Sequence, residues 1–491
     1  MTAKITILAV FGAVLVALAI RSARRAHAYE DFNLNGRRTG LPALVGTLGA
    51  AEFNTATLIG GASVAYLYGT VGIYYTSLIF IFVFSIYALT VAKPYRRLQI
   101  STIAEYFERR FTGRLSEPTR ALASVITLTF TWIAPATYLA GLSVIVAVLL
   151  GVDPVPTVVA ITVLCLVLAL AAGFITALSF DVFAYGMILV FVPVLFIVAY
   201  TNSGGFSSLG DVFEPQFLSF EPVWDLEAYG FAAVLTWGFQ NIMLYLAAPW
   251  YGQRIFSART ESIAYRGMII NTVLITVLYG LVVLATMFSR VLMPDLDAPE
   301  EALPRLVLDY TSPIMQGLLL VTLLLVGITT MVAIWNAAVS IVVNDLLRRY
   351  AFRDRDDRFY INASRVVFLV LGASTLLFAL TFVGSILLAL TYVSVFTALL
   401  AFPILAGLYW RRFTTLAALL SMIAGVVYVS IALLFSFPYH LVSPVGVALS
   451  AVVGVATTLA RPGTGPEPEV EEFFAVAKGN KEYADSGPAT A

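Results

Sequence analysis

The chain has 491 residues, of which 60% are hydrophobic and 12% are charged. Soluble domains are about 45–50% apolar and about 25% charged, so this composition excludes a soluble protein and predicts an all-α protein that crosses the lipid bilayer many times. The formal net charge is zero, which gives no reason to expect a nucleic-acid partner. One cysteine, Cys165, excludes a disulfide framework and a thiolate metal cluster.

Long apolar stretches predict about thirteen membrane spans, because about 17–25 apolar residues are needed to cross a bilayer. They lie at residues 4–21, 41–68, 72–93, 118–150, 155–174, 180–201, 228–250, 264–289, 313–346, 362–380, 383–409, 414–436 and 441–460. The first stretch is expected to remain as a helix. Its positive charges follow the apolar run, which is the reverse of the order in a cleaved signal peptide.

The basic residues are sorted between the two sides of these spans. If the spans alternate, Lys4, Arg290 and Arg305 fall on one side and the rest of the 29 Lys and Arg fall on the other. Loops rich in Lys and Arg stay in the cytoplasm. The chain is therefore expected in the cell (inner) membrane, with its N-terminus outside and its C-terminus in the cytoplasm.

Two segments outside the spans have clear compositions. Residues 101–111 alternate charged and aromatic side chains, which predicts a short amphipathic helix on the cytoplasmic face. The tail at 462–491 is polar and contains Pro, Gly and Glu, and it is expected to be disordered.

The second span has polar residues in its middle. Residues 48–69 read LGAAEFNTATLIGGASVAYLYG and contain Glu52, Asn54 and Thr57. A carboxylate at membrane depth costs at least about 2.5 kcal/mol unless it is paired or faces water, and unwound backbone is tolerated there only where it lines a cavity. Secondary transporters build their substrate and ion sites from broken helices of this kind, so the segment predicts a transporter.

A second polar segment lies at residues 237–253, WGFQNIMLYLAAPWYGQ. Asn241 and Tyr245 precede Pro249, whose missing N–H frees a carbonyl about one turn earlier. One reading is a second broken helix that lines a substrate pocket. The other is a proline-kinked helix whose amides hold neighbouring helices together.

A third polar group is the pair of adjacent hydroxyls at Thr329 and Thr330, inside a long apolar span. Threonine in a membrane helix often bonds only to the carbonyl four residues earlier. Hard cations, however, take oxygen ligands. Unwound carbonyls near Ala50 and Phe53, facing these two hydroxyls, would form a cage for a small monovalent ion.

Asp181 lies near the start of its predicted span, in the sequence ITALSFDVFAYG. It has two readings. It belongs to the first turn of a helix capped by Ser179, where a carboxylate is favourable, or it is a carboxylate on an ion path near the cytoplasmic mouth.

The sequence contains neither a phosphate-binding loop of the GxxxxGK[ST] type nor a glycine-rich dinucleotide fingerprint. It also offers no nucleophile and base that could be argued to act together. Transport driven by ATP hydrolysis in this chain and enzymatic catalysis are therefore not expected.

These segments resemble the sodium/solute symporter family, which includes bacterial proline and sialic-acid symporters and the sodium/glucose symporters. The resemblance is carried by NLNGRRTG at 33–40, GAAEFNTATLIGGASVAYLYG at 49–69, GFITALSFDV at 173–182, ITTMVAIWNAAVSIVVNDL at 328–346 and FTALLAFPILAGLYWRR at 396–412. It implies a leucine-transporter-type core of two inverted five-helix repeats. The implied division is a first helix and loop at 1–40, repeats at 41–201 and 228–409 joined by an extracellular loop at 202–227, two peripheral helices at 410–461, and the tail at 462–491.

The resemblance also implies the residues of two sites. The family's sodium site would use the carbonyls of Ala50, Phe53 and Val326 and the hydroxyls of Thr329 and Thr330. The substrate pocket would be lined by Glu52, Asn54, Thr57, Asn241 and Tyr245. Some members have a second sodium site that uses an aspartate at the place of Asp181, and it would be absent here because Val332 and Ala333 replace its hydroxyls.

The expected function is import of a small polar organic solute, an amino acid or a related zwitterion, coupled to sodium ions by alternating access. Proton coupling through Glu52 is the alternative within transport. A membrane sensor or receptor is the alternative from another class, and no signalling module follows residue 460 to support it. The sequence carries no signal for an oligomeric state.

Overall fold

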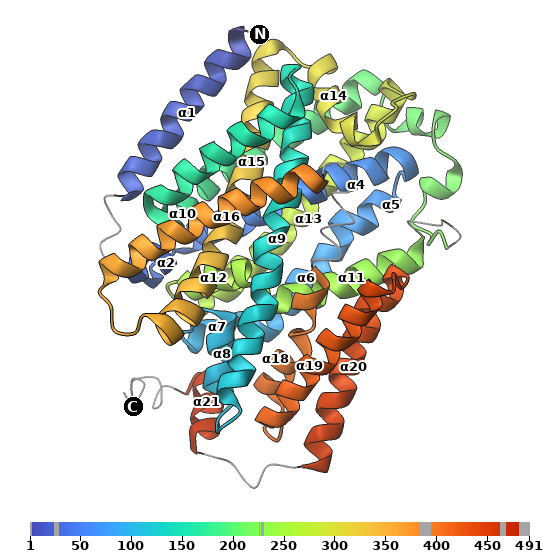
Figure 1. Cartoon of the computed structure of the whole chain (residues 1–491). Helices are drawn as coiled ribbons and strands as arrows, with labels where there is room; N and C mark the ends of the chain where they lie inside the picture. The colour runs from blue at the N-terminus through green and yellow to red at the C-terminus, as the bar shows by residue number, and fades with distance from the viewer. Residues whose placement is uncertain are drawn as a thin grey trace.

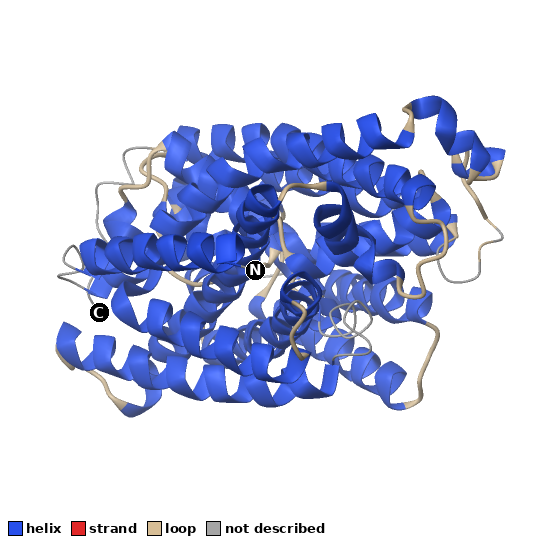
Figure 2. Cartoon of the chain, turned by 90° about the horizontal axis from the view of Figure 1, so that it is seen from above, coloured by secondary structure: helices blue, strands red, loops and turns tan. Residues whose placement is uncertain are grey.

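The computed structural model describes residues 2–23, 29–224, 226, 230–382, 394–461 and 468–480. In these residues all regular structure is helical apart from one isolated bridge between Thr39 and Ala258 (Figure 2). The predicted all-α class is confirmed.

Eight helices of the described residues are long and apolar enough to cross a membrane, and one bent pair adds a ninth span. The long spans are Val71–Arg97, α9 (Ser116–Leu150), the second part of α10 (Pro154–Ser203) from Phe174 onward, α13 (Glu261–Leu292), Pro313–Ala351, α16 (Asp357–Phe382), α19 (Thr415–Leu434) and α20 (Tyr439–Ala460). The bent pair is α11 (Phe231–Leu246) with α12 (Pro249–Ser257).

Shorter apolar helices account for the other predicted spans. They are part of α1 (Thr2–Ala23), α3 (Leu41–Glu52) with α4 (Thr55–Tyr68), Val155–Leu170 at the start of α10, and Ser394–Tyr409, which ends in α18 (Ala401–Tyr409). Every predicted span therefore contains an apolar helix or a broken pair. The start of the eleventh span, residues 383–393, lies outside the described residues.

Several spans are assembled from short pieces. Val71–Arg97 consists of α5 (Val71–Ile73), α6 (Ile79–Tyr87) and α7 (Lys93–Arg97), with wider π-helical turns at Tyr74–Leu78 and Ala88–Ala92 between them. α15 (Pro313–Ser340) continues as the π-helical segment η7 (Ile341–Ala351). The connections between spans contain the short helices α2 (Tyr29–Leu34), α8 (Ile103–Arg110) and α14 (Ala302–Tyr310), and the tail contains α21 (Pro468–Lys478). The connections also contain 3-10 turns at Asn35–Arg37, Phe206–Asp211, Pro215–Phe217 and Pro299–Glu301.

The helix predicted at residues 41–68 is broken in its middle, as the polar residues indicated. α3 ends at Glu52, and Phe53 has a non-helical ψ of 73°. Asn54 is extended, and its side-chain oxygen accepts a hydrogen bond from the backbone N–H of Thr57 at 2.8 Å. Asn54 is therefore the N-cap that starts α4.

The second predicted break is also present. α11 ends at Leu246, α12 starts at Pro249, and the two helices meet at an angle of 45°. Proline is tolerated in the first turn of a helix because its missing N–H would have no partner there. Pro249 thus starts a new helix, and the reading of one kinked helix is wrong.

Asp181 does not lie in the first turn of a helix. The apolar segment that contains it starts at Phe174, so Asp181 lies about two turns inside it. The hydroxyl of Ser179 donates to the carbonyl of Ile175, four residues earlier, at 3.0 Å. Since that bond belongs to a continuing helix and not to a cap, the helix N-terminus reading is wrong.

The tail predicted to be disordered contains a folded helix. α21 lies beside α7 and α8 at one end of the molecule (Figure 1), and it buries Phe473 and Phe474. The guanidinium of Arg110 faces the ring of Phe474 at 5.1 Å. Burying two large aromatic side chains stabilises the helix enough to offset its ordering cost, so disorder is wrong for residues 468–478; residues 462–467 and 481–491 lie outside the described part.

The helix predicted at 101–111 is confirmed as α8. Its apolar side chains Tyr106 and Phe107 are fully buried by the protein itself, so its apolar face packs on other helices and not on lipid.

Candidate substrate and sodium site

The predicted sodium ligands of α15 lie against the broken end of α3. The hydroxyl of Thr330 lies 2.9 Å from the carbonyl oxygen of Val326 and 3.3 Å from that of Ala50. The hydroxyl of Thr329 lies 3.2 Å from the same Val326 carbonyl. The backbone of one broken helix and two hydroxyls of a facing helix therefore form one cluster of oxygen atoms.

Phe53, the remaining predicted ligand, lies next to this cluster. Its ψ of 73° turns its carbonyl out of the helical pattern of α3, and its ring stacks on Tyr279 with 4.8 Å between centroids. Phe53 and Val326 also line one small cavity of about 20 Å3, whose lining is apolar apart from Thr322 and does not include Ala50, Thr329 or Thr330, so it lies beside the oxygen cluster and is not the ion position.

This cluster suits a small hard cation. Thr329 and Thr330 are both 1% exposed, and the donors are carbonyl and hydroxyl oxygens, which hard cations prefer. A hydroxyl that donates its proton to a carbonyl keeps its lone pairs free for an ion. The observed bond from Thr330 to Val326 is therefore compatible with both readings, helix back-bonding and ion coordination.

Glu52 lies at the end of α3 and is fully buried. The hydroxyl of Tyr245, on α11, donates to its Oε2. Its Oε1 has no hydrogen-bond partner, and no ion pair among the described side chains includes Glu52. A buried carboxylate without a cation is costly, so this position requires a bound cation or a proton.

Tyrosine hydroxyls hold the unwound backbone next to Glu52. Tyr279 of α13 donates to the carbonyl of Glu52 at 2.9 Å, and the side-chain amide of Asn54 donates to the same oxygen at 2.9 Å. Tyr251 of α12 donates to the carbonyl of Leu48 at 3.1 Å. Tyr251 and Tyr279 were not among the predicted site residues, because nothing in the spacing of either residue shows that it faces the break.

Aromatic rings surround the Glu52–Tyr245 pair. The ring of Tyr245 lies 5.0 Å from that of Tyr251, 5.3 Å from Phe84 and 5.9 Å from Trp250, measured between centroids. The Glu52–Tyr245 pair therefore lies beside a packed group of aromatic rings.

Thr57 and Asn241 make hydrogen bonds to groups other than the Glu52 carboxylate. Thr57 is 7% exposed, and Asn54 caps its backbone N–H. The amide nitrogen of Asn241 donates to the carbonyl of Trp237 on its own helix at 2.8 Å. The structure thus brings Glu52 and Tyr245 together directly, holds Asn54 and Thr57 at the same break, and records no contact of Asn241 with Glu52.

Asp181 has a cationic partner that the sequence analysis did not identify. The Nη2 of Arg254, on α12, lies 2.8 Å from its Oδ2, and both side chains are fully buried. The hydroxyl of Thr47 donates to the same carboxylate oxygen. Arg254 follows an apolar segment and precedes further basic residues, so the sequence placed it with the cytoplasmic loop charges.

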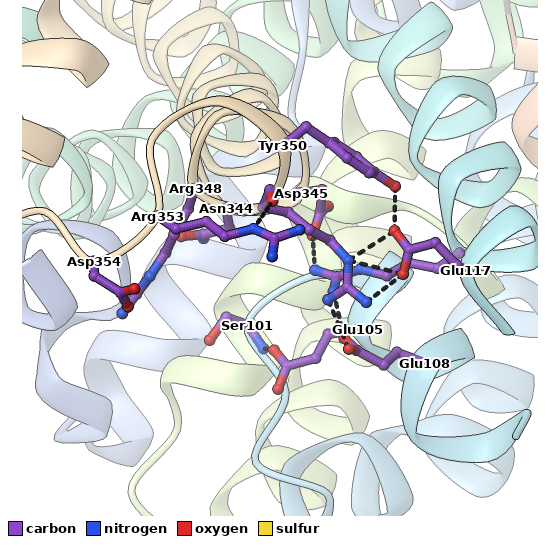
Figure 3. A pocket seen from close by; sticks show the side chains of 12 residues that line it. Ser101, Glu105, Glu108, Glu117, Asn344, Asp345, Arg348, Tyr350, Arg353 and Asp354 are labelled. Atoms are coloured by element: carbon purple, nitrogen blue, oxygen red, sulfur yellow. Dashed lines mark hydrogen bonds and ion pairs between the residues drawn. The ribbon is translucent and has the colours of Figure 1, made fainter. Parts of the chain in front are cut away.

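A large cavity lies away from both sites. It has a volume of about 900 Å3 and lies where α8, the start of α9 and η7 meet. Figure 3 shows its charged lining, with Glu108, Glu117 and Asp345 among the labelled side chains. Arg349 pairs with Glu108 and Glu117, and Arg120 pairs with Glu108 and Asp345. These acidic and basic side chains therefore pair with one another across the junction of the three segments.

A family model described as the sodium:solute symporter family matches residues 32–425. The chain belongs to this family. The match covers both broken helices and α15, and it confirms the resemblance found in the sequence.

Two relatives are named sodium-coupled transporters. The sodium/mannose cotransporter of Bos taurus is 23% identical over 371 residues, which cover 67% of this chain and 62% of the relative. Sodium-coupled monocarboxylate transporter 1 of Homo sapiens is 27% identical over 363 residues, which cover 70% of this chain and 58% of the relative. The matched segments thus span about three fifths of each relative. The family and these relatives are transporters and not enzymes.

Solved structures confirm the fold. A Na+-coupled sialic acid symporter, in a substrate-bound outward-open state, is similar with a TM-score of 0.79 and 17% identity, covering 95% of this chain and 99% of that chain. Mhp1, a transporter of the nucleobase-cation-symport-1 family in a closed conformation, has a TM-score of 0.58 and 14% identity, covering 90% and 98%. The chain therefore has the leucine-transporter-type fold.

Proposed function

We propose that the chain imports a small organic solute with a positively charged ammonium group, an amino acid or a related zwitterion, together with sodium. The observation that carries the choice of solute is Glu52. Its carboxylate is fully buried, one oxygen has no partner, and no Lys, Arg or His pairs with it among the described side chains. An ammonium group would neutralise this charge, whereas an anionic solute would add a second negative charge.

Sodium coupling rests on the oxygen cluster of Ala50, Val326, Thr329 and Thr330, with Phe53 beside it. The relatives with sodium-coupled names support the same choice of ion. A sodium ion here would join α3 to α15 and would fix the broken end of α3. Since Glu52 is part of that broken end, ordering by sodium would also position the carboxylate for the solute.

A sodium ion bound at this cluster would drive the alternating-access cycle by moving down its electrochemical gradient. Moving one positive charge through about 100 mV is worth about 2.3 kcal/mol. We place the N-terminus outside and the C-terminus in the cytoplasm, as the charge sorting predicts. An inward sodium gradient and a membrane potential that is negative inside both favour import with sodium.

Proton coupling at Glu52 is the second candidate. It is favoured by the same unpaired oxygen, since a proton on Oε1 would neutralise the carboxylate without any solute. Glu52→Gln alone does not distinguish the two candidates. A neutral glutamine removes the partner of an ammonium group and also removes the proton site, so only the dependence on ions separates them.

The test is the thermal stability of the purified protein with panels of solutes, in sodium and in potassium. The panels are zwitterionic amino acids, organic amines, monocarboxylates and sugars. A solute at ten times its Kd stabilises the native state by about 1.4 kcal/mol. We expect stabilisation by a zwitterion or an amine that requires sodium and is lost in Glu52→Gln. The stabilisation is expected to survive in the control variant Asp345→Asn, which neutralises another buried carboxylate that pairs with Arg120 and does not contact Glu52.

Uptake into liposomes then separates the two candidates. Sodium symport predicts uptake driven by a sodium gradient at constant pH. Uptake that is driven by a pH gradient without sodium, and that Glu52→Gln abolishes, would show that the coupling ion is the proton and not sodium. Stabilisation by sugars or monocarboxylates that is unchanged in Glu52→Gln would refute the proposed class of solute.

A further inference from the structure

The buried ion pair of Asp181 and Arg254 joins three helices at one point. Arg254 of α12 donates from Nη2 to Asp181 of α10 at 2.8 Å, and from Nε to the backbone carbonyl of Thr47 of α3 at 3.0 Å. Thr47 in turn donates its hydroxyl to Asp181. Both charged side chains are fully buried, so the pair is inaccessible to water in this conformation.

Two of these three helices, α3 and α12, are joined to each other. α3 and α12 are halves of the two broken helices, and backbone hydrogen bonds connect their ends. The N–H of Thr39, before α3, donates to Ser257 at 3.1 Å, and the N–H of Arg259, after α12, donates to Thr39 at 2.9 Å. We call α3 and α12 with this bridge the paired half-helices. They connect to loops on the side where the charge sorting places most of the basic residues.

The third helix, α10, packs tightly against α3 next to Asp181. A Cβ atom at Gly49 would overlap the ring of Tyr185, and a Cβ at Gly46 would lie 3.1 Å from the backbone of Val182. Glycine is thus required at Gly49 for the two backbones to approach so closely. α3 and α10 are therefore in close contact from Gly46 to Gly49, next to the ion pair.

We propose that Asp181 and Arg254 form a lock that holds the paired half-helices against α10 and closes the route from the break to the basic-loop side. The lock has two states. When the helices are in contact, the charges attract each other without competition from water. When the helices separate, water reaches both charges and stabilises them individually, so the open state is also accessible. The lock acts in the same way whichever solute or ion the protein carries.

The experiment measures access to a cysteine placed behind the lock, in the full-length protein. Ala51 is 2% exposed and lies on α3 between Thr47 and the break, so Ala51→Cys is the reporter in a background with the native cysteine removed by Cys165→Ser. A membrane-impermeant maleimide is applied to vesicles from the basic-loop side, without sodium or solute. We expect Asp181→Asn to raise the labelling rate about tenfold, which corresponds to about 1.4 kcal/mol in the opening equilibrium.

A matched control separates the lock from a general loss of stability. Asp345→Asn also removes a buried ion pair, since Asp345 binds Arg120 at 2.8 Å with both side chains at most 8% exposed. That pair joins α9 to η7 and touches neither paired half-helix. The labelling rate of the reporter is expected to stay unchanged in this variant even if its melting temperature falls.

A second variant opens the interface while it keeps both charges. Gly49→Ala places a methyl group against Tyr185, so it is expected to raise labelling as Asp181→Asn does. Adding Tyr185→Leu removes the clashing ring and is expected to restore slow labelling. If Asp181→Asn fails to fold, Gly49→Ala decides the question. Labelling within twofold of the parent in folded Asp181→Asn or folded Gly49→Ala would overturn the lock.

Discussion

Replacing Thr330 by alanine tests the sodium cluster at its most informative atom. The hydroxyl of Thr330 is the one side-chain group recorded in contact with both the broken end of α3, at Ala50, and the carbonyl of Val326 on its own helix. Its removal deletes one proposed ion ligand and also the direct link between α3 and α15. The side chain is 1% exposed, so no water molecule from bulk solvent replaces the lost oxygen without rearrangement.

The expected effect has two parts. The lost hydrogen bond lowers the free energy of unfolding by about 0.5–1.5 kcal/mol, equally in sodium and in potassium. The lost ion ligand acts only in sodium. If sodium is present at ten times its Kd, it stabilises the parent by about 1.4 kcal/mol, and this increment is expected to disappear in Thr330→Ala.

The assay is the melting temperature of the purified protein in matched sodium and potassium salts. Thr330→Ser keeps the hydroxyl and is expected to keep the sodium increment. Thr286→Ala is the matched control, because Thr286 is also fully buried but donates to the carbonyl of Val282 on its own helix at 2.8 Å. A sodium increment of equal size in the parent and in Thr330→Ala would show that the ion does not bind at this cluster.

Two further predictions follow from contacts that the sequence did not reveal. Tyr279→Phe removes the 2.9 Å bond to the carbonyl of Glu52, which is expected to lower stability by about 0.5–1.5 kcal/mol and to weaken solute binding in the thermal assay; unchanged solute binding would show that the break is held without this hydroxyl. Deletion from residue 468 onward removes α21 and exposes the surfaces that bury Phe473 and Phe474, so the melting temperature is expected to fall; an unchanged melting temperature would show that α21 adds nothing to the stability of the fold.

The spans and both breaks were predictable because each leaves a local trace in the sequence. A membrane span requires a long apolar run, and the polar residues around Glu52 and the proline at Pro249 interrupt such runs. Asn54 is a favoured N-cap residue, and its position fixes where α4 starts. These signals are contained in a few neighbouring residues, so they need no knowledge of the rest of the fold.

The contacts that complete the site were not predictable in this way. Tyr279 and Glu52 are 227 residues apart in the chain, and a tyrosine in an apolar span has the same local sequence whether it faces lipid or a carbonyl. The helix α14 was not predicted either, because it lies in a loop and is only nine residues long. The folded tail was predicted as disordered because its composition is polar, although two phenylalanines suffice to anchor it.

The two buried carboxylates show why composition alone does not separate a binding site from a structural ion pair. In the sequence, Glu52 and Asp181 are both acidic residues inside apolar spans, and both qualified as sites for a cation. In the structure, each carboxylate leaves one oxygen without a hydrogen-bond partner, but Asp181 receives a guanidinium and a hydroxyl, whereas Glu52 receives the phenol of Tyr245 and no cation among the described side chains. A charge that the protein already neutralises has little to gain from a ligand, and one that it leaves uncompensated has much to gain. This difference supports the proposal that Glu52 binds the ligand and that Asp181 holds helices together. Neutralising each residue in turn separates the two roles, because Glu52→Gln is expected to change solute binding without changing access to the Ala51→Cys reporter.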